Sequence, residues 1–362
     1  MVIAVSNKQI RSLPLAVLCA LLLGTTARAL PLPEELETAL PEGLLAASES
    51  EGPINGGLHW LLDSAGETAG RVLREGTRNA ALLVLTAVLC GAAESVTAGA
   101  GGPAPRFVPW CAVLAAVTLS AGDLRALIGL GARTVDELGT LSKLLLPALA
   151  AAMAAGGCVS SAGMLQAGTL LACDLLSDAV SRFLLPLVYC YIALAAAGTL
   201  LENDRLDSAA ETLRKLTAWG LKAVTGAFTG YLTLSGALTG SADKAAVKAA
   251  KAALSGAIPV VGGVLSDAAE GVLAAAGTAR VTLGALGVFA ILALCLTPML
   301  RLGTQYLFYK AAAFAAGLAG TEKLSDLLDR MGEAFALVLG MTAACAAVLL
   351  AALLVAAVMV TA

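Results

Sequence analysis

Histidine is nearly absent from this 362-residue chain, and charged residues are scarce. The chain has one histidine, His59, and charged side chains make up 14% of its residues, where about 25% is usual. One histidine cannot build a metal centre from several imidazoles, and the sequence contains no P-loop, GxGxxG or HExxH motif. These absences predict a chain that has no catalytic site and no cofactor, and that is therefore not an enzyme.

The chain also lacks paired cysteines and an excess of basic residues. None of its eight cysteines forms a CxxC pair, and each stands in an apolar stretch, so we expect small buried side chains rather than disulfides or metal ligands. Lysine and arginine number 23 against 26 acidic residues, which gives a net charge of −3. Without a basic surface, nucleic acid is excluded as a partner.

What the chain has in excess is apolar surface. Hydrophobic residues make up 59% of it and the mean hydropathy is +0.86, more than a water-soluble core is able to bury. Aromatic residues make up only 4%, while alanine and glycine are abundant, which is typical of closely packed membrane helices rather than of a β-barrel. The composition predicts an all-α, polytopic membrane protein whose first partner is the lipid bilayer.

The N-terminus carries the pattern of a secretory signal. Lys8 and Arg11 precede an apolar run, Leu13–Leu23, and the tripeptide Ala-Arg-Ala ends at Ala29. This order predicts a signal peptide over residues 1–29 that is cleaved after Ala29, with an uncleaved anchor as the alternative. In either case the next segment begins outside the cytoplasm.

Residues 30–79 are predicted to form an extracytoplasmic lead-in. Proline and glutamate are frequent as far as Pro53, a composition typical of a loosely ordered segment. From Leu58 to Leu73 apolar residues recur at helical spacing, with charges on the other face, which predicts an amphipathic helix. The remainder, residues 80–362, is predicted to be a multi-span membrane domain.

Uncharged runs of about 20 residues mark the clearest predicted spans, Phe183–Leu201, Ala223–Ala242, Val281–Leu300 and Ala334–Ala362. The weaker ones are Ala80–Ala98, which contains Glu94, the short Phe107–Gly122, and Leu302–Gly320, which Lys310 interrupts. We expect six to eight transmembrane helices.

A further run, Leu144–Cys173, is too long for one straight helix and contains Gly156-Gly157, which predicts a bent or broken helix. If this run crosses once, the basic segment Lys244–Lys251 faces the cytoplasm, as the positive-inside rule prefers.

Amphipathic segments between the spans predict connecting helices that lie along the membrane surface. Thr134 and Glu137 form a T-x-x-E capping box, which predicts a helix start. Glu211 and Lys215 are an i,i+4 pair on a second such helix. A third has an apolar face made of Leu324, Leu327, Leu328 and Met331.

The stretch 254–277 combines an apolar start, a helix-breaking centre and an acidic end. Pro259 and the pair Gly262-Gly263 interrupt the helical pattern. Asp267 and Glu270 follow, three residues apart, on one face of the next helical turn. The pattern predicts a broken or re-entrant helix. Two interpretations stay open: a pore or packing element whose carboxylates face water, and a surface turn between two interfacial helices.

Two more carboxylates, Asp174 and Asp178, stand four residues apart at the end of an apolar run. Ionisable side chains inside a membrane mark functional sites, so both are candidate membrane carboxylates. No motif of an intramembrane aspartyl protease surrounds them, and we favour a helix-end position in water over acid–base chemistry.

The segment from Ile258 to Glu270 resembles the signature region of the stage III sporulation protein AE family. The matching positions are Pro259, Val260, Val261, Gly262, Ser266, Asp267 and Glu270. The order of signal sequence, lead-in and many spans is also similar to that family. The resemblance implies a multi-pass protein of the mother-cell-derived membrane around an engulfed forespore, with other stage III membrane subunits and a forespore membrane protein as partners. It implies no catalytic residue.

The function that the resemblance implies is that of a non-enzymatic component of the secretion-like channel, or feeding tube, that joins mother cell and forespore. The resemblance also implies that such a component is needed for forespore development after engulfment. The alternative is a self-contained permease for a small solute, with Asp174, Asp178, Asp267 and Glu270 as pathway carboxylates.

Overall fold

The structure, a computed structural model, describes residues 43–44, 46–47, 54–99, 107–257 and 262–358, and over these residues it contains helices and no strand. The helices are α4 (Asn55–Gly99), α5 (Phe107–Ala155), α6 (Val159–Ala179), the π-helical η1 (Val180–Leu184), α7 (Leu185–Leu201), α8 (Asp204–Ala257), α9 (Gly262–Leu318) and α10 (Glu322–Val358). The predicted all-α fold is confirmed.

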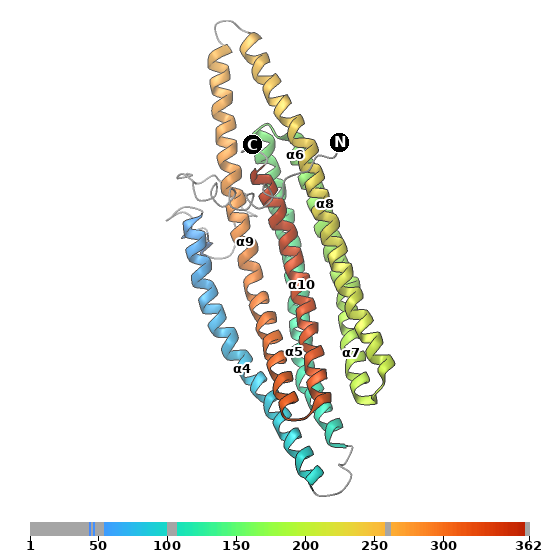
Figure 1. Cartoon of the computed structure of the whole chain (residues 1–362). Helices are drawn as coiled ribbons and strands as arrows, with labels where there is room; N and C mark the ends of the chain where they lie inside the picture. Colours follow the sequence, from blue (N-terminus) through green and yellow to red (C-terminus); the bar gives the residue numbers. More distant parts are fainter. Residues whose placement is uncertain (1–42, 45, 48–53, 100–106, 258–261, 359–362) are drawn as a thin grey trace, which may run out of the picture.

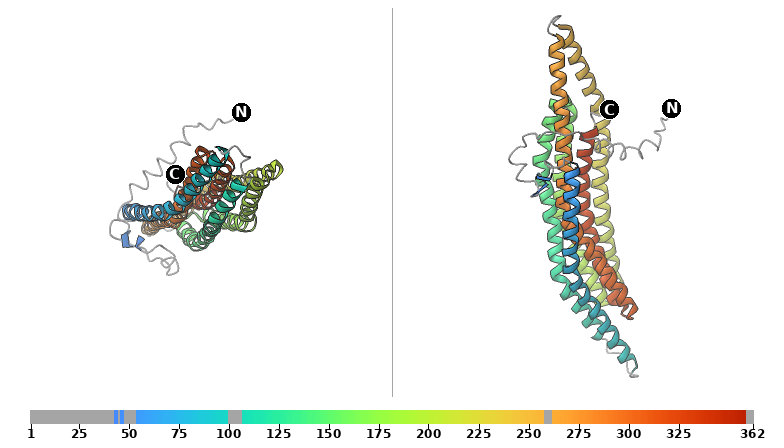
Figure 2. Two further views of the ribbon diagram at one scale, coloured as in Figure 1. Left: turned by 90° about the horizontal axis from the view of Figure 1, so that it is seen from below. Right: turned by 90° about the vertical axis from the view of Figure 1, so that its left-hand side faces the viewer.

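Within the described residues the helices form six long rods that run alternately up and down (Figure 1). α6, η1 and α7 follow one another without a gap and make a single rod, in which the π-helical turn is an insertion of the kind often found inside long helices. α10 packs against α5, α6, α7, α8 and α9, whereas α4 lies at the edge against α9 and α5. The bundle seen along its length in Figure 2 is therefore organised around α10.

The predicted break at Gly156-Gly157 is confirmed. α5 ends at Ala155, and Gly157 has a φ of +84°, the left-handed conformation that glycine adopts without strain. Gly320, between α9 and α10, has the same φ of +84°. Both glycines reverse the chain between helices that pack side by side.

This reversal makes α5 and α6 an antiparallel hairpin rather than one crossing. Lys143 of α5 lies 3.0 Å from Asp174 of α6, and Ser177 donates to Asp136 over 3.2 Å. A single crossing by Leu144–Cys173, the condition for the predicted orientation, does not fit this hairpin. The predicted cytoplasmic position of Lys244–Lys251, in α8, depended on that single crossing. The hairpin therefore removes the support for this orientation.

Four helical stretches in the described part of the chain are long and apolar enough to cross a membrane. They are Val113–Ala155, Val159–Leu201, Val281–Leu318 and Glu322–Ala356. At about 1.5 Å per residue they measure about 50 to 65 Å, against a hydrocarbon layer of about 30 Å. These four support insertion into a membrane. The predicted count of six to eight transmembrane helices is not confirmed and stays a prediction. Two of the predicted spans, Ala80–Ala98 and Ala223–Ala242, lie in α4 and α8, and neither helix is among these four stretches.

Two predicted connectors lie within long helices of the bundle. Thr134 lies in the middle of α5, where its buried hydroxyl donates to the carbonyl of Leu130 over 2.9 Å, so the capping-box prediction is wrong. The face that includes Leu327 and Leu328 is fully buried in the bundle, so the prediction of a surface helix is also wrong. In both cases the local pattern is correct for a helix but does not show where the helix begins or what covers it.

The remaining local predictions have mixed outcomes. Glu211 and Lys215 do pair, at 3.3 Å. The predicted helix of the lead-in is the first part of α4. Val72 of its apolar face is buried, but Leu58, Leu62 and Leu73 are 47–60% exposed, so the amphipathic role stays a prediction. The predicted signal peptide lies outside the described residues.

Glycines let the rods approach closely at several points. A Cβ at Gly131 would collide with Val338, and one at Gly287 would collide with Leu145. At Gly91 of α4 the obstacle is the backbone carbonyl of Ala319, beside the turn between α9 and α10. A flexible side chain is able to move aside, but a backbone carbonyl in a turn is not.

We predict that Gly91→Ala destabilises the bundle by about 1–3 kcal/mol, because the new methyl group forces α4 away from Ala319. Thermal unfolding of the purified protein in detergent measures this. Gly66→Ala on the same helix is the matched control, since nothing lies within 4 Å of a Cβ there. It should leave stability unchanged or raise it. Equal melting temperatures for the two variants would contradict the close contact.

Candidate functional site

The predicted motif lies at the end of the α8–α9 hairpin. α8 ends at Ala257 and α9 begins at Gly262, so the predicted break falls between these two helices, and residues 258–261 lie outside the described residues. This end of the hairpin projects beyond the ends of the other rods (Figures 1 and 2). Pro259, Val260 and Val261 lie outside the described residues.

The other motif residues lie in the first turns of α9. Gly262 and Gly263 begin the helix, and Ser266, Asp267 and Glu270 follow in it. The structure describes their helical backbone and not their side chains. A water-facing or packing role for these residues therefore stays a prediction.

The carboxylates Asp174 and Asp178 lie one turn apart on the exposed side of α6, and each has its own cation. Asp174 is 3.0 Å from Lys143, and Asp178 is 3.3 Å from Arg182. Both side chains are 59% exposed. A shared-proton pair needs two carboxylates held together away from cations, so this geometry does not favour acid–base chemistry.

These two residues belong to a larger surface that local sequence patterns did not reveal. The α5–α6 hairpin places charged residues of both helices side by side, and all of them are exposed. We call this surface the charged strip; it consists of Arg133, Asp136, Glu137 and Lys143 from α5, and of Asp174, Asp178 and Arg182 from α6 and η1. The strip forms because the chain reverses at Gly156-Gly157 and brings α5 and α6 side by side. The periodicity within each helix does not show that the two helices are neighbours.

A second polar cluster, which sequence reasoning missed, joins α7, α8 and α10. The hydroxyl of Tyr191, a buried residue, lies 3.2 Å from Oε2 of Glu333 and 3.1 Å from the carbonyl oxygen of Arg330. Arg214 lies 3.4 Å from the same Glu333 carboxylate, and Arg330 pairs with Asp207. We call this the inter-helix network. It fixes three helices to one another by ion pairs that are about two-thirds buried.

Arg214 also binds Glu211 through two hydrogen bonds of 2.7 Å. These bonds lower the pKa of Glu211 from 4.5 to about 2, and the same contact raises the pKa of the Arg214 guanidinium above its usual value. A carboxylate whose pKa is lowered by folding adds stability at pH values above its unfolded pKa. That contribution is lost as the pH falls from about 4.5 towards 2.

Further polar pairs tie α9 to its neighbours. Lys310 of α9 lies 2.6 Å from Asp329 of α10, which explains how a lysine is accommodated within an otherwise apolar stretch. Arg301 pairs with Glu75 of α4 at 3.2 Å. Charges on the apolar helices are thus mostly matched inside the chain, as expected for ionisable groups in membrane helices.

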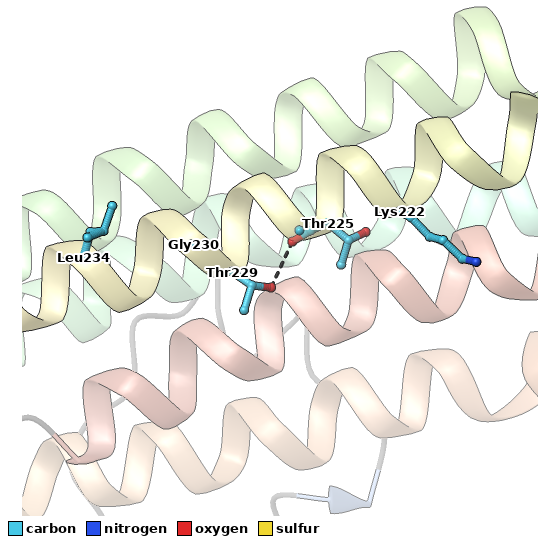
Figure 3. Close-up of a pocket in the computed structure, with 6 residues that line it drawn as sticks. Lys222, Thr225, Thr229, Gly230 and Leu234 are labelled. Atoms are coloured by element: carbon cyan, nitrogen blue, oxygen red, sulfur yellow. Dashed lines mark hydrogen bonds between the residues drawn. The ribbon is translucent and has the colours of Figure 1, made fainter. Parts of the chain in front are cut away.

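The exposed face of α8 carries an open groove of about 660 Å³ (Figure 3). Lys222 stands at one end and Leu234 at the other, with Gly226 and Gly230 between them. The Thr229 hydroxyl donates to a backbone carbonyl one turn earlier, so it is satisfied within the helix. Small residues four apart allow another helix to approach closely, but the groove encloses no ligand site.

The described residues include no cluster of three histidine, cysteine, aspartate or glutamate side chains that would hold a metal ion. The seven described cysteines are free thiols. Four helical stretches long and apolar enough to cross a membrane, with charges mostly matched inside the chain, support the class of polytopic helical membrane proteins.

The chain belongs to the stage III sporulation protein AE family, because the family model matches residues 77–362, from within α4 to the end. A similar protein is "Stage III sporulation protein AE" of Bacillus subtilis (strain 168), with 23% identity over 197 residues. The aligned part is 54% of this chain and 49% of that protein, so the match spans about half of the relative's length. No solved structure matches the chain.

We predict that Arg330→Met lowers the free energy of unfolding by about 1–3 kcal/mol, because it leaves the half-buried Asp207 carboxylate without its cation. Lys323→Met, which removes the more exposed pair with Glu202, is the control and should cost about 0–1 kcal/mol. Denaturant titration of both variants in detergent measures the difference. If Lys323→Met lowered the free energy of unfolding as much as Arg330→Met does, burial of the inter-helix network would add nothing to stability beyond an exposed ion pair.

Proposed function

We propose that this protein is a non-enzymatic membrane subunit of the channel complex that connects the mother cell with the forespore. The observation that carries the proposal is the family match over residues 77–362, which takes in every helix from the second half of α4 onward. The helix lengths support it, since rods of about 50–65 Å reach out of a bilayer of about 30 Å. Helices that extend beyond the membrane offer surfaces to other subunits as well as to lipid.

The proposed location is the mother-cell-derived membrane around the engulfed forespore, with the chain directed there by a signal peptide cleaved after Ala29. The proposed partners are the other stage III membrane subunits and a protein of the forespore membrane. The α8–α9 hairpin is the proposed contact with them, because it projects past the bundle and carries the motif on which the family resemblance rests (Figure 1).

We predict that deletion of the gene in its native host lets forespores engulf and then arrests their maturation, because the forespore loses its supply from the mother cell. Microscopy of sporulating cells and counts of heat-resistant spores measure this, with the restored gene as the control. Heat-resistant spores at the normal level would contradict the proposal. Solute uptake by the purified protein reconstituted alone would then become the test of a permease.

We also predict that Asp267→Asn combined with Glu270→Gln lowers the number of heat-resistant spores while the protein level stays the same. The substitutions keep the size of both side chains and remove their charge, so a carboxylate that faces water or a partner loses its role. Asp63→Asn combined with Glu67→Gln, exposed on α4 outside the motif, is the matched control. Normal sporulation by the motif variant would show that these carboxylates are dispensable.

A further inference from the structure

We propose that the charged strip of α5 and α6 faces water within the passage that the complex forms, so that this hairpin lines the passage. The inference rests on the proposed channel function and adds to it the surface that does the lining. Three features of the strip carry it: its depth relative to the apolar helices, its exposure, and the order of its charges.

The first feature is depth. Gly131 of α5 lies against Val338 of α10, and further along α5 Leu145 is level with Leu353, since both lie against Gly287. The α5 part of the strip therefore runs beside the segment 338–353 of α10. That segment lies inside 334–358, which contains no charged residue and is the longest uncharged run among the four candidate spans. Where α10 crosses the hydrocarbon, the strip is at the same depth.

The second feature is exposure. Lys143, Asp174 and Asp178 have side chains that are about 60% exposed, and Arg182 is 72% exposed. Charged groups at bilayer depth face protein or a water-filled space, because hydrocarbon does not solvate them. The strip lies on the outside of this bundle, so something other than lipid covers it.

The third feature is the order of charges, which favours water over a second copy of the chain. The pairs Lys143–Asp174 and Ser177–Asp136 set the register of the hairpin. In this register Arg133 and Arg182 share one level, and the carboxylates of Asp136, Glu137 and Asp178 share the next. Copies inserted in the same direction would set arginines against arginines and carboxylates against carboxylates, which is unfavourable.

A different protein helix is also disfavoured as the cover. Arg133 and Glu137 have no ion-pair partner among the described residues, so a covering helix would have to supply an opposite charge to each of them at bilayer depth, where an unpaired charge is costly. Water solvates paired and unpaired groups alike. With three cations and four anions in the strip, the lined space would admit small polar solutes of either charge.

The test is cysteine labelling in membranes from sporulating cells that carry the full-length chain with its eight native cysteines replaced by alanine. One variant adds Glu137→Cys, an exposed strip position that lies between Gly131 and Leu145. The matched control adds Ala347→Cys, an exposed position of α10 that lies at the same depth, between Val338 and Leu353. Membrane-impermeant thiosulfonates are applied from both sides of the membrane, one reagent cationic and the other anionic.

We expect both reagents to modify Glu137→Cys on the order of tenfold faster than Ala347→Cys, because the reactive thiolate forms in water and not in hydrocarbon. Slow labelling at Glu137→Cys by both reagents would overturn the inference, and cross-linking of that cysteine to another protein would identify a subunit as the cover. Equally fast labelling at both positions would overturn the depth argument.

The proposed function is judged separately, by whether each labelled strain still forms heat-resistant spores. Normal spores together with slow labelling would overturn the lining inference alone. Normal spores after gene deletion would overturn the channel function whatever the labelling shows.

Discussion

The packing of α10 against five other helices is the interaction on which the rest of the structure depends. Because residues 334–358 of α10 are uncharged and most of the described side chains among them are buried, the neighbouring helices pack against this segment without burying unpaired charge. Glycines on the neighbouring helices, such as Gly131 opposite Val338, set the register of each contact. Once this register is set, the position of every charged group along the bundle follows, including the inter-helix network and the charged strip.

Two groups of charges in this chain have different physical roles. Those of the inter-helix network are about two-thirds buried and are matched across helices, as Arg330 is with Asp207, so they hold α7, α8 and α10 in place. Those of the charged strip are exposed and only partly matched, so they contribute little to holding the bundle together. An exposed surface that does not serve stability is free to contact water or other molecules.

Sequence reasoning reached the all-α class, the break at Gly156-Gly157 and the Glu211–Lys215 pair, because composition, glycine pairs and i,i+4 spacing are local signals. It missed the inter-helix network because Tyr191 and Glu333 are 142 residues apart, and no periodicity connects them. It misplaced a helix start at Thr134 because a capping-box pattern also fits a helix interior, where the hydroxyl bonds back to the preceding turn. In both failures, contacts between segments distant in the sequence decided the structure.

The lengths of the helices connect the fold to the proposed function. α9 has 57 residues and is about 85 Å long, so less than half of it fits within a hydrocarbon layer of about 30 Å. The remainder must lie in water or among other subunits, which explains why one helix carries both an apolar stretch and the acidic residues of the projecting hairpin. A self-contained carrier needs no such extension. A subunit that connects a membrane with an assembly on either side of it does need helices that extend beyond the bilayer. The length of α9 therefore favours the channel component over the permease.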